Sequence, residues 1–376
     1  MSQNHLNKTQ TVNLGSFYTP DYIVEIAYKM IFNYFQKNKK YNLNDFVLFD
    51  SSCGYGNFFK VPTKFKNLNF IKKIGIDIDN EALEIAKNNF KYYKNPPLFL
   101  NKNSLINISR KNFNINENAK LIIIGNPPYN DKTSIVQNRI KNKIYSVDLS
   151  LKCRDLGMSF LLSFDKLKAD YICILHPLSY LIKETNFKTL KIFFENYQIL
   201  NSVIISSQIF CPNSLGFFPI IIALYKRNEK GIDYNFIRNY KFKTIDNKKF
   251  CLNDFDFISK YIDKYPNKNR VQGKVAMFYT MRDINALRRS KTFIQKDCAN
   301  AVYIPKSKYS LYCYVDVFKQ IISTVPYYFG NCDIMIDYNK FKKIESDFIK
   351  ASESKIINNK ILNYFENLLG EHYENY

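Results

Sequence analysis

The segment LIIIGNPPYN, residues 121–130, ends an apolar run with residues that fix the backbone and offer hydrogen-bond acceptors. A proline after Asn126 forces Asn126 into an extended conformation, and Pro127 followed by Pro128 fixes two successive φ angles. The side-chain oxygen of Asn126 and the carbonyl oxygen of Pro127 are therefore held in set directions. Two rigid acceptors suit a substrate with two N–H bonds, such as an exocyclic amine, and Tyr129 adds a face on which a flat base can stack. The expected catalytic segment is Asn126, Pro127, Pro128 and Tyr129.

This segment could instead be a strand that prolines simply stop, but that alternative predicts no ligand-binding loop upstream. Such a loop is present in DSSCGYGNFF, residues 50–59. Gly54 and Gly56 allow a tight turn and a close approach of ligand to backbone, and a helix beginning near Asn57 would present unpaired N–H groups. The sequence therefore predicts a cofactor loop.

An acidic residue follows the next apolar run at the spacing that a ribose requires. Asp77, in IGIDID, lies 21 residues after Gly56, where a carboxylate can accept both ribose hydroxyls. This arrangement serves NAD as well as S-adenosylmethionine, but the dinucleotide fingerprint needs a third glycine where Phe59 stands. The alternative is that the glycines form an ordinary turn and that the acidic residues of IGIDID are simply solvated, with no ligand bound.

Short apolar runs separated by helical stretches must position these residues. We expect buried strands at 46–50, 72–78, 97–100, 120–125, 170–176, 201–206 and 218–225, and helices within 80–93 and 159–168. A first helix follows TPDYIVEIAYKMI, with Thr19 as N-cap and Pro20 in the first helical position. Strand and helix alternation predicts an α/β fold with a doubly wound parallel sheet, whose ligands bind outside the carboxyl ends of the strands.

With these motifs in order, residues 15–226 resemble the DNA methyltransferases that act on the adenine N6 amine. GSFYTP (15–20) resembles the motif that holds the methionine end of the cofactor, and FDSSCGYGNFF (49–59) resembles the glycine loop. GIDID (75–79) resembles the ribose-binding segment, and GNPPY (125–129) the catalytic one. SSQIFCPN (206–213) resembles the segment whose aromatic residue, here Phe210, packs on a flipped adenine.

The resemblance implies a seven-stranded Rossmann-like methyltransferase domain and S-adenosylmethionine as cofactor. Two positions depart from the family: Ser51 replaces a usual proline, and Asn103 stands where an aspartate commonly contacts the cofactor adenine. An amide oxygen can still accept that hydrogen bond. The implied cofactor-binding residues are Phe17, Tyr18, Thr19, Pro20, Asp50, Cys53, Gly54, Gly56, Asp77, Ile78, Asn103 and Ser104.

The remaining chain differs in composition and carries much of the positive charge. Strand and helix alternation stops near 225–235, which predicts a methyltransferase domain at 1–230 and an α+β target recognition domain at 231–376. The net charge is +22. An AT-biased genome inflates the number of lysines but not of arginines, and four of only nine arginines fall within 270–289. Arginines can hydrogen-bond to base edges or bind phosphates of DNA. The alternative is that these charges simply lie on a solvent-exposed helix face, as most runs of charged residues do. The predicted DNA contacts are Arg282, Arg288, Arg289 and Lys291.

The expected partner is double-stranded DNA, and the family is compatible with a restriction endonuclease encoded separately. The alternatives are a methyltransferase acting on protein glutamine or RNA adenine, and a non-catalytic DNA-binding subunit. A fused nuclease would rest on Asp347, Glu353 and Lys355, which read as a chance match in a helix. Residues 130–150 form either a flexible edge over DNA or an ordinary loop.

Composition excludes several other classes. No apolar run of 18 residues and no signal-peptide core occur, so the sequence predicts a cytoplasmic protein that does not enter membranes. Eight scattered cysteines without a CxxC pair, and three histidines, predict free and mostly buried thiols and no metal site. His176 ends a strand without a partner that would mark it as a base, so we expect a structural or pocket-rim role.

Overall fold

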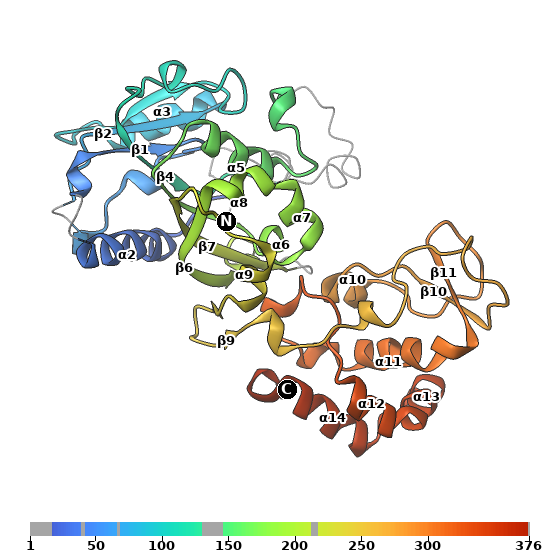
Figure 1. Ribbon diagram of the computed structural model, residues 1–376. Coiled ribbons are helices and arrows are strands. Elements are labelled where there is room, and N and C mark those ends of the chain that lie inside the picture. Colours follow the sequence, from blue (N-terminus) through green and yellow to red (C-terminus); the bar gives the residue numbers. More distant parts are fainter. Residues whose placement is uncertain (1–16, 39–41, 66–67, 130–145, 212–216, 375–376) are drawn as a thin grey trace. The chain divides into compact units, whose positions relative to one another are not determined.

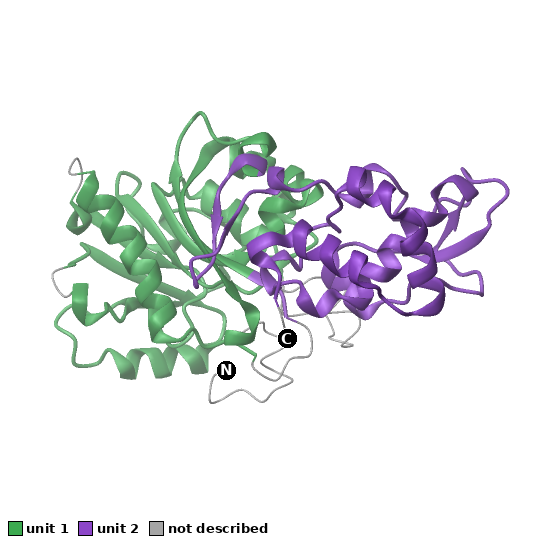
Figure 2. Cartoon of the chain, turned by 90° about the horizontal axis from the view of Figure 1, so that it is seen from below, with its two compact units in different colours: residues 1–214, 220–237 green, residues 215–219, 238–376 purple. Residues whose placement is uncertain are grey.

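The computed structural model describes residues 17–38, 42–65, 68–129, 146–211 and 217–374. The chain divides into two compact units, coloured in Figure 2: unit 1 is Met1–Ser214 with Ile220–Ile237, and unit 2 is Leu215–Pro219 with Arg238–Tyr376. The boundary after Ile237 lies seven residues beyond position 230. The short passage Leu215–Pro219, which interrupts unit 1, has no counterpart in the predicted domain division.

Unit 1 is built on a seven-stranded sheet in the order β3-β2-β1-β4-β5-β7-β6. The strands, labelled in part in Figure 1, are β1 Phe46–Asp50, β2 Lys72–Asp77, β3 Leu98–Asn101, β4 Lys120–Gly125, β5 Tyr171–Pro177, β6 Tyr197–Ser206 and β7 Pro219–Arg227. All seven predicted strands are present, and β6 begins four residues earlier than predicted. The α/β, Rossmann-like class is confirmed.

The sheet is mixed, whereas the sequence predicts a parallel one. The strands β3, β2, β1, β4 and β5 pair in parallel, but β7 pairs with β5 in antiparallel register. The connection from β6 to β7 spans residues 207–218, and its described part contains only a 3₁₀ turn, Ser207–Ile209. An antiparallel neighbour needs no crossover helix, whereas a parallel one needs a crossover of a dozen or more residues, usually with a helix.

Helices cover both faces of this sheet. Every residue of β1 and β5 is buried, and successive strand residues point to opposite faces, so neither face is open to water. The described helices of this part of the chain are α2 Asp21–Lys37, α3 Asn80–Asn89, α5 Leu156–Lys166, α6 Ser179–Ile182, α7 Glu184–Thr189, α8 Lys191–Asn196 and α9 Tyr234–Asn239. The predicted start of α2 is one residue early, because Pro20 is its N-cap with an extended backbone and Thr19 lies outside the helix.

Unit 2 has small sheets and a helical core. Its elements are β8 Phe242–Lys243, β9 Lys249–Phe250, β10 Ala276–Tyr279, α10 Ile284–Arg289, β11 Ala301–Ile304, α11 Tyr309–Gln320, α12 Tyr338–Lys343, α13 Glu345–Ser354 and α14 Asn359–Leu369. The rings of Tyr314, Phe348 and Phe365 contact one another where α11, α13 and α14 meet. These buried rings form the centre of the unit's core.

Two findings concern membrane-spanning helices and the state of the cysteines. Within the described ranges, no helix is long and apolar enough to cross a membrane. All eight cysteines are free, as predicted. Only half of them are buried, which is fewer than predicted: Cys53, Cys173, Cys313 and Cys332.

Candidate active site

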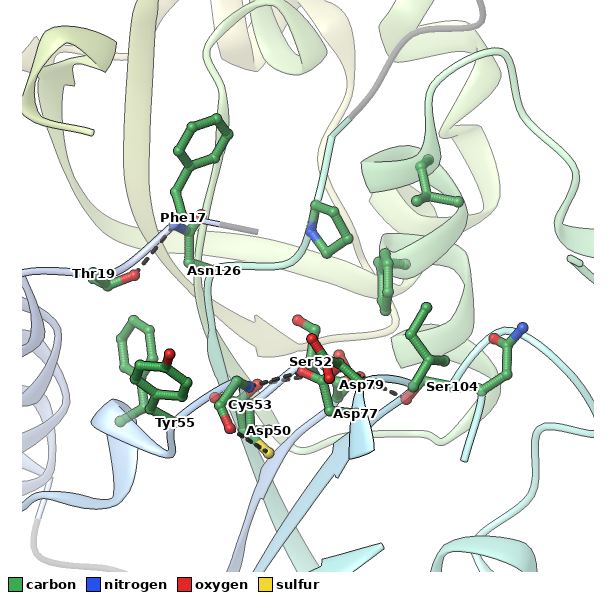
Figure 3. Close-up of a pocket in the computed structure, with 18 of the residues that line it drawn as sticks. Phe17, Thr19, Asp50, Ser52, Cys53, Tyr55, Asp77, Asp79, Ser104 and Asn126 are labelled. Atoms are coloured by element: carbon green, nitrogen blue, oxygen red, sulfur yellow. Dashed lines mark hydrogen bonds between the residues drawn. The ribbon is translucent and has the colours of Figure 1, made fainter. Parts of the chain in front are cut away.

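A pocket lies in unit 1 where the strands β1, β2, β3 and β4 end (Figure 3). It spans about 960 Å³, counting the part open to solvent. The predicted site residues that line it are Phe17, Tyr18, Thr19, Asp50, Cys53, Gly54, Asp77, Ile78, Asn103, Ser104, Asn126 and Pro128. Pro20, Gly56, Pro127, Tyr129 and Phe210 do not line it.

Asp77 holds the glycine loop. Its Oδ2 accepts a hydrogen bond of 2.8 Å from the Gly54 N–H, and its Oδ1 accepts one of 3.0 Å from the Asp79 N–H. Gly54 and Gly56 both have positive φ, at 48° and 76°. Each carboxylate oxygen retains a second lone pair, so Asp77 can still accept from a hydroxyl in the pocket.

The helix predicted to begin near Asn57 is a single 3₁₀ turn, Asn57–Phe59. Pro62 explains this difference, because the residue before a proline is disfavoured in the helical conformation and Val61 occupies that position. The loop therefore presents its backbone turn and side chains to the pocket, without the dipole of a long helix.

Asp50 is buried behind the glycine loop. Its Oδ1 accepts from the Ser52 N–H at 3.1 Å, while its Oδ2 is buried without a hydrogen-bond partner. Burial raises the pKa of this carboxyl to about 8, and the charge of Asp77 adds to the shift. A Cβ at Gly125, where φ is +152°, would lie 2.7 Å from Asp50 Oδ1. Gly125 is thus required at the end of β4, a role that the sequence analysis did not assign.

Thr19 anchors the side chain of Asn126. The Asn126 Nδ2 donates to Thr19 Oγ1 at 3.2 Å, as the dashed line in Figure 3 shows, and Asn57 Nδ2 donates to the Thr19 carbonyl at 2.9 Å. The Asn126 Oδ1 is buried and has no hydrogen-bond partner. The amide is therefore fixed through its nitrogen, and its oxygen is an available acceptor.

Unpaired polar atoms gather around this pocket. Buried polar atoms are normally hydrogen-bonded, so such a group points to a ligand that supplies the missing partners. The four atoms are Asp50 Oδ2, Ser52 Oγ, Asn57 Oδ1 and Asn126 Oδ1. The described residues that line the pocket include three acidic ones, Asp50, Asp77 and Asp79, and one lysine, Lys102, whose ammonium donates to Asn112. This donor set fits a ligand with hydroxyl groups and positive charge, as S-adenosylmethionine has.

Asn103 and Ser104 are placed by hydrogen bonds to nearby chain segments. The Asn103 Oδ1 accepts from the Leu105 N–H at 2.8 Å, and its Nδ2 donates to the Ser146 carbonyl at 2.9 Å. The Ser104 hydroxyl donates to the Ser51 carbonyl at 2.6 Å. The Ser104 bond ties the segment after β3 to the glycine loop, and the Asn103 bonds hold that segment to Ser146.

Several residues that line the pocket were not predicted from the sequence, although some of them lie inside the motifs described above. They are Ser51, Ser52, Tyr55, Asn57, Phe58, Asp79, Lys102, Leu105, Ser146, Leu156 and Phe160. Leu156 and Phe160 are four residues apart on α5, a spacing that a core-facing helix also has. The sequence therefore held no signal to separate them from ordinary core residues.

The predicted base-stacking residues, Tyr129 and Phe210, do not line the pocket, although Pro128 does. Phe210 is only 3% exposed, and Tyr129 is partly buried. Burial raises the pKa of the Tyr129 phenol, and the nearby Cys211 and Asp155 raise it further. The segments that carry Tyr129 and Phe210 thus approach each other, and stacking on a base stays a prediction.

His176 has a structural environment, as expected. It is 1% exposed, its Nε2 lies 2.7 Å from the Tyr225 hydroxyl oxygen, and burial lowers its pKa to about 4. Its ring stacks on Tyr180 at 5.3 Å between ring centres.

The predicted DNA-binding residues of unit 2 divide into two groups. The side chains of Arg282, Arg289 and Lys291 are exposed. Arg288 is half-buried, and its guanidinium donates to the Ile322 carbonyl at 3.1 Å. This bond favours a structural role for Arg288 over the predicted DNA contact.

The other sequence hypotheses have definite outcomes where the chain is described. Residues 15–16, 130–145 and 212–213, which belong to segments discussed above, lie outside the described residues. The Lys355 ammonium binds Asp316 and the Asp347 carboxylate accepts from Asn358, so the nuclease-like trio does not converge. Within the described ranges, no three histidine, cysteine, aspartate or glutamate side chains are grouped to hold a metal ion.

The strand order and the pocket together define the fold of S-adenosylmethionine-dependent methyltransferases. The chain belongs to the N-6 DNA methylase family, whose model matches residues 3–294. The cofactor is therefore S-adenosylmethionine, and the protein is a methyltransferase.

Solved structures of related fold are similar to this chain at low identity. A type I restriction-modification methyltransferase subunit from Streptococcus thermophilus has 14% identity and a TM-score of 0.42, covering 88% of this chain and 57% of that one. A putative RNA methyltransferase from Pyrococcus horikoshii has 15% identity and a TM-score of 0.38, covering 57% of this chain and 88% of that one. A putative class I methyltransferase from Listeria monocytogenes has 14% identity and a TM-score of 0.41, covering 61% and 65%.

Proposed function

We propose that the protein transfers a methyl group from S-adenosylmethionine to the N6 amine of adenine in duplex DNA, at a defined sequence. The target base would leave the helix to reach the site, at a cost of a few kcal/mol that stacking offsets. The observation that carries the proposal is the buried, unpartnered Oδ1 of Asn126, whose amide nitrogen is anchored on Thr19.

The pocket residues would hold the cofactor by charge and hydroxyl recognition. Asp77 suits the ribose hydroxyls, and the buried Asp50 suits a positively charged group. Leu156 and Phe160 supply apolar surface for a planar ring. When bound, the cofactor supplies an electrophilic methyl group on sulfur.

Asn126 and Pro127 would activate the amine. The adenine N6 lone pair is delocalised into the ring and is a poor nucleophile. If Asn126 Oδ1 and the Pro127 carbonyl each accept one N–H bond, the nitrogen is drawn toward a tetrahedral shape and its lone pair becomes available. This contribution is positioning and electrostatics, without a covalent enzyme intermediate.

The decisive experiment is long-read detection of N6-methyladenine in DNA from cells that express the protein, which gives activity and target sequence together. Asn126→Ala should abolish methylation while S-adenosylmethionine still binds, as measured by calorimetry. Asn118→Ala, in an exposed loop before β4, is the matched control and should leave both unchanged. Methylation at the wild-type rate in Asn126→Ala would refute the mechanism.

Two further assays separate the proposed substrate and setting from their alternatives. Purified protein with labelled cofactor should methylate duplex DNA, and label found only in RNA or in a protein glutamine would replace DNA as the substrate. We also propose that the protein is the methyltransferase of a restriction-modification system. DNA methylated by it should then resist an endonuclease that cuts the same sequence.

A further inference from the structure

Tyr129 packs on the first turn of α5, at a glycine. A Cβ built on Gly157 would lie 2.9 Å from the Tyr129 Cβ and 2.5 Å from the Tyr180 hydroxyl oxygen. Both distances are shorter than real Cβ contacts, so any side chain at position 157 would displace one of the two tyrosines. Gly157 lies in a helix, where alanine is otherwise favoured by about 1 kcal/mol. Glycine here therefore serves the close packing.

Asp155 holds both Gly157 and Tyr180 by hydrogen bonds. As the N-cap of α5, its Oδ1 accepts from the Gly157 N–H at 2.9 Å, and the same oxygen accepts from the Tyr180 hydroxyl. Asp155 and Tyr129 are also close enough for the carboxylate to raise the pKa of the Tyr129 phenol. The first turn of α5 thus holds a carboxylate and a buried phenol beside the catalytic segment.

Buried aromatic rings restrain this cluster from behind. Tyr180 is 1% exposed and stacks on His176 with an angle of 5° between the rings. His176 is in turn held by Tyr225, whose hydroxyl lies 2.7 Å from its Nε2. Because His176 and Tyr225 belong to β5 and β7, the cluster is built on the sheet itself.

The same helical turn also borders the pocket. Leu156 and Phe160 line the pocket, and Gly157 lies between them in the sequence. A ligand that contacts Leu156 and Phe160 would restrain the turn on which Tyr129 packs. The turn therefore lies between the cofactor pocket and the residue expected to stack on the substrate base.

We propose that Gly157, Asp155 and Tyr180 are positioning residues that hold Tyr129 for stacking on the target base, and that cofactor binding tightens this support. The proposal rests on the proposed function, since the target base is the substrate of that reaction. Coupling of this kind is reciprocal, so bound substrate should also strengthen cofactor binding.

The principal test is Tyr180→Phe, which removes the hydroxyl that Asp155 accepts. Loss of one hydrogen bond to a charged group should lower kcat about tenfold, without changing the dissociation constant of S-adenosylmethionine. Tyr197→Phe is the matched control, because it removes another buried hydroxyl of unit 1, bound at 2.8 Å to the Ala169 carbonyl. The control should lower thermal stability to a similar degree and leave kcat unchanged.

A double-mutant cycle tests whether Tyr180 acts through Tyr129. In a Tyr129→Ala background, measured in single turnovers, Tyr180→Phe should cause no further loss. Gly157→Ala should lower kcat by a similar factor and serves as an independent variant. Wild-type kcat in Tyr180→Phe and Gly157→Ala, or equal losses with and without Tyr129, would overturn the proposal.

Hydrogen exchange separates this proposal from the proposed function. In free protein, Tyr180→Phe should speed amide exchange in the peptide that covers Asn126 and Tyr129, and S-adenosylmethionine should slow it in wild type. Unchanged exchange in the variant refutes the positioning role. If wild-type protein methylates no DNA, the proposed function fails, while the exchange experiment still decides whether Tyr180 supports Tyr129.

Discussion

Buried polar side chains are treated differently in the two units. In unit 2, the buried Asp316 accepts hydrogen bonds from Thr292, Ser352 and Lys355 at 2.6 to 2.8 Å. In unit 1, Asp50 is buried to the same degree, yet one of its oxygens has no partner. A buried aspartate therefore links three neighbouring residues in unit 2, whereas in unit 1 a buried aspartate lines a pocket.

This difference indicates which unit has buried polar atoms left for a ligand to pair with. A saturated carboxylate contributes to folding, whereas an unsaturated one costs stability until a ligand pairs with it. Among the described residues of unit 2, Arg288 Nε and Asn331 Oδ1 are also buried and unpaired, but neither residue lines the pocket. The four that do line it mark unit 1 as the part of the chain prepared for a ligand.

The largest expected effect is at Gly125. In Gly125→Ala the new Cβ would meet Asp50 at 2.7 Å with an unfavourable φ, and we expect a loss of about 3 kcal/mol or more of unfolding free energy. S-adenosylmethionine binding should be lost with it. Calorimetry and thermal unfolding measure both quantities.

Gly273→Ala in unit 2 is the matched control for that change. Gly273 also has a positive φ, +68°, but its Cβ would meet nothing within 4 Å. Backbone strain alone should cost about 1 kcal/mol, with cofactor binding intact. Equal effects of the two substitutions would show that the contact with Asp50 does not matter.

Asp316→Ala should have the next largest effect and should be confined to unit 2. Three hydrogen bonds are lost, so we expect a loss of about 2 to 3 kcal/mol in the free energy of unfolding. Hydrogen exchange should become faster in α11 and α13, and S-adenosylmethionine should bind as in wild type. A fall in cofactor affinity would contradict the contrast between the two carboxylates.

Asp50 should make cofactor binding depend on pH. Its pKa of about 8 in the free protein means that a cationic ligand, which prefers the carboxylate, must displace a proton below that pH. Affinity should therefore rise toward pH 8, by up to about tenfold per pH unit, and level off above it. The free protein changes in the opposite direction: since the folded state holds this proton more tightly than the unfolded state does, stability falls from about pH 4 to about pH 8.

Asp50→Asn should remove this pH dependence, which calorimetric titrations from pH 6 to 9 can measure. Asp45→Asn, at the exposed residue just before β1, should retain the wild-type profile. A wild-type profile in Asp50→Asn would assign the proton to another group.

The smallest expected effect distinguishes neighbouring arginines of α10. Arg289→Ala should weaken DNA binding a few-fold and reduce the slope of log affinity against log salt by about 0.9, because one phosphate contact is lost. Arg288→Ala should lower the stability of unit 2 and leave that slope unchanged, since Arg288 is half-buried on the Ile322 carbonyl, whereas Arg289, which donates to Asn285 within its own helix, is exposed. Reversed results would make Arg288 the DNA-contacting residue.

The sequence predicted what depends on local order in the chain. Apolar runs located all seven strands, and residues that follow strands, such as Gly54, Asp77 and Asn126, converge because the strand ends meet at one edge. The antiparallel β7 was missed because an apolar run carries no information on direction. Pairing decides direction, and pairing joins residues far apart in sequence.

Contacts between distant segments could not be predicted. The cluster at Tyr129 joins residues 129, 155–157 and 180, and no motif links them. Arg288 and Arg289 are adjacent and chemically identical, yet only the packing of α10 determines which one is turned inward. Thr19 was expected to cap a helix, but the structure uses its hydroxyl for Asn126.

Residues 217–219 belong to unit 2 although they lie between segments of unit 1, and this limits how the chain can be recombined. Within unit 2, Asn285 Nδ2 donates to the Phe217 carbonyl at 3.0 Å, and Arg288 lies over the Phe217 ring. A hybrid joined to a relative at Ile237 alone would pair a foreign α10 with a resident Phe217. Exchange of unit 2 between relatives therefore requires two junctions, one between β6 and β7 and one after Ile237, and single-junction chimaeras should fold poorly.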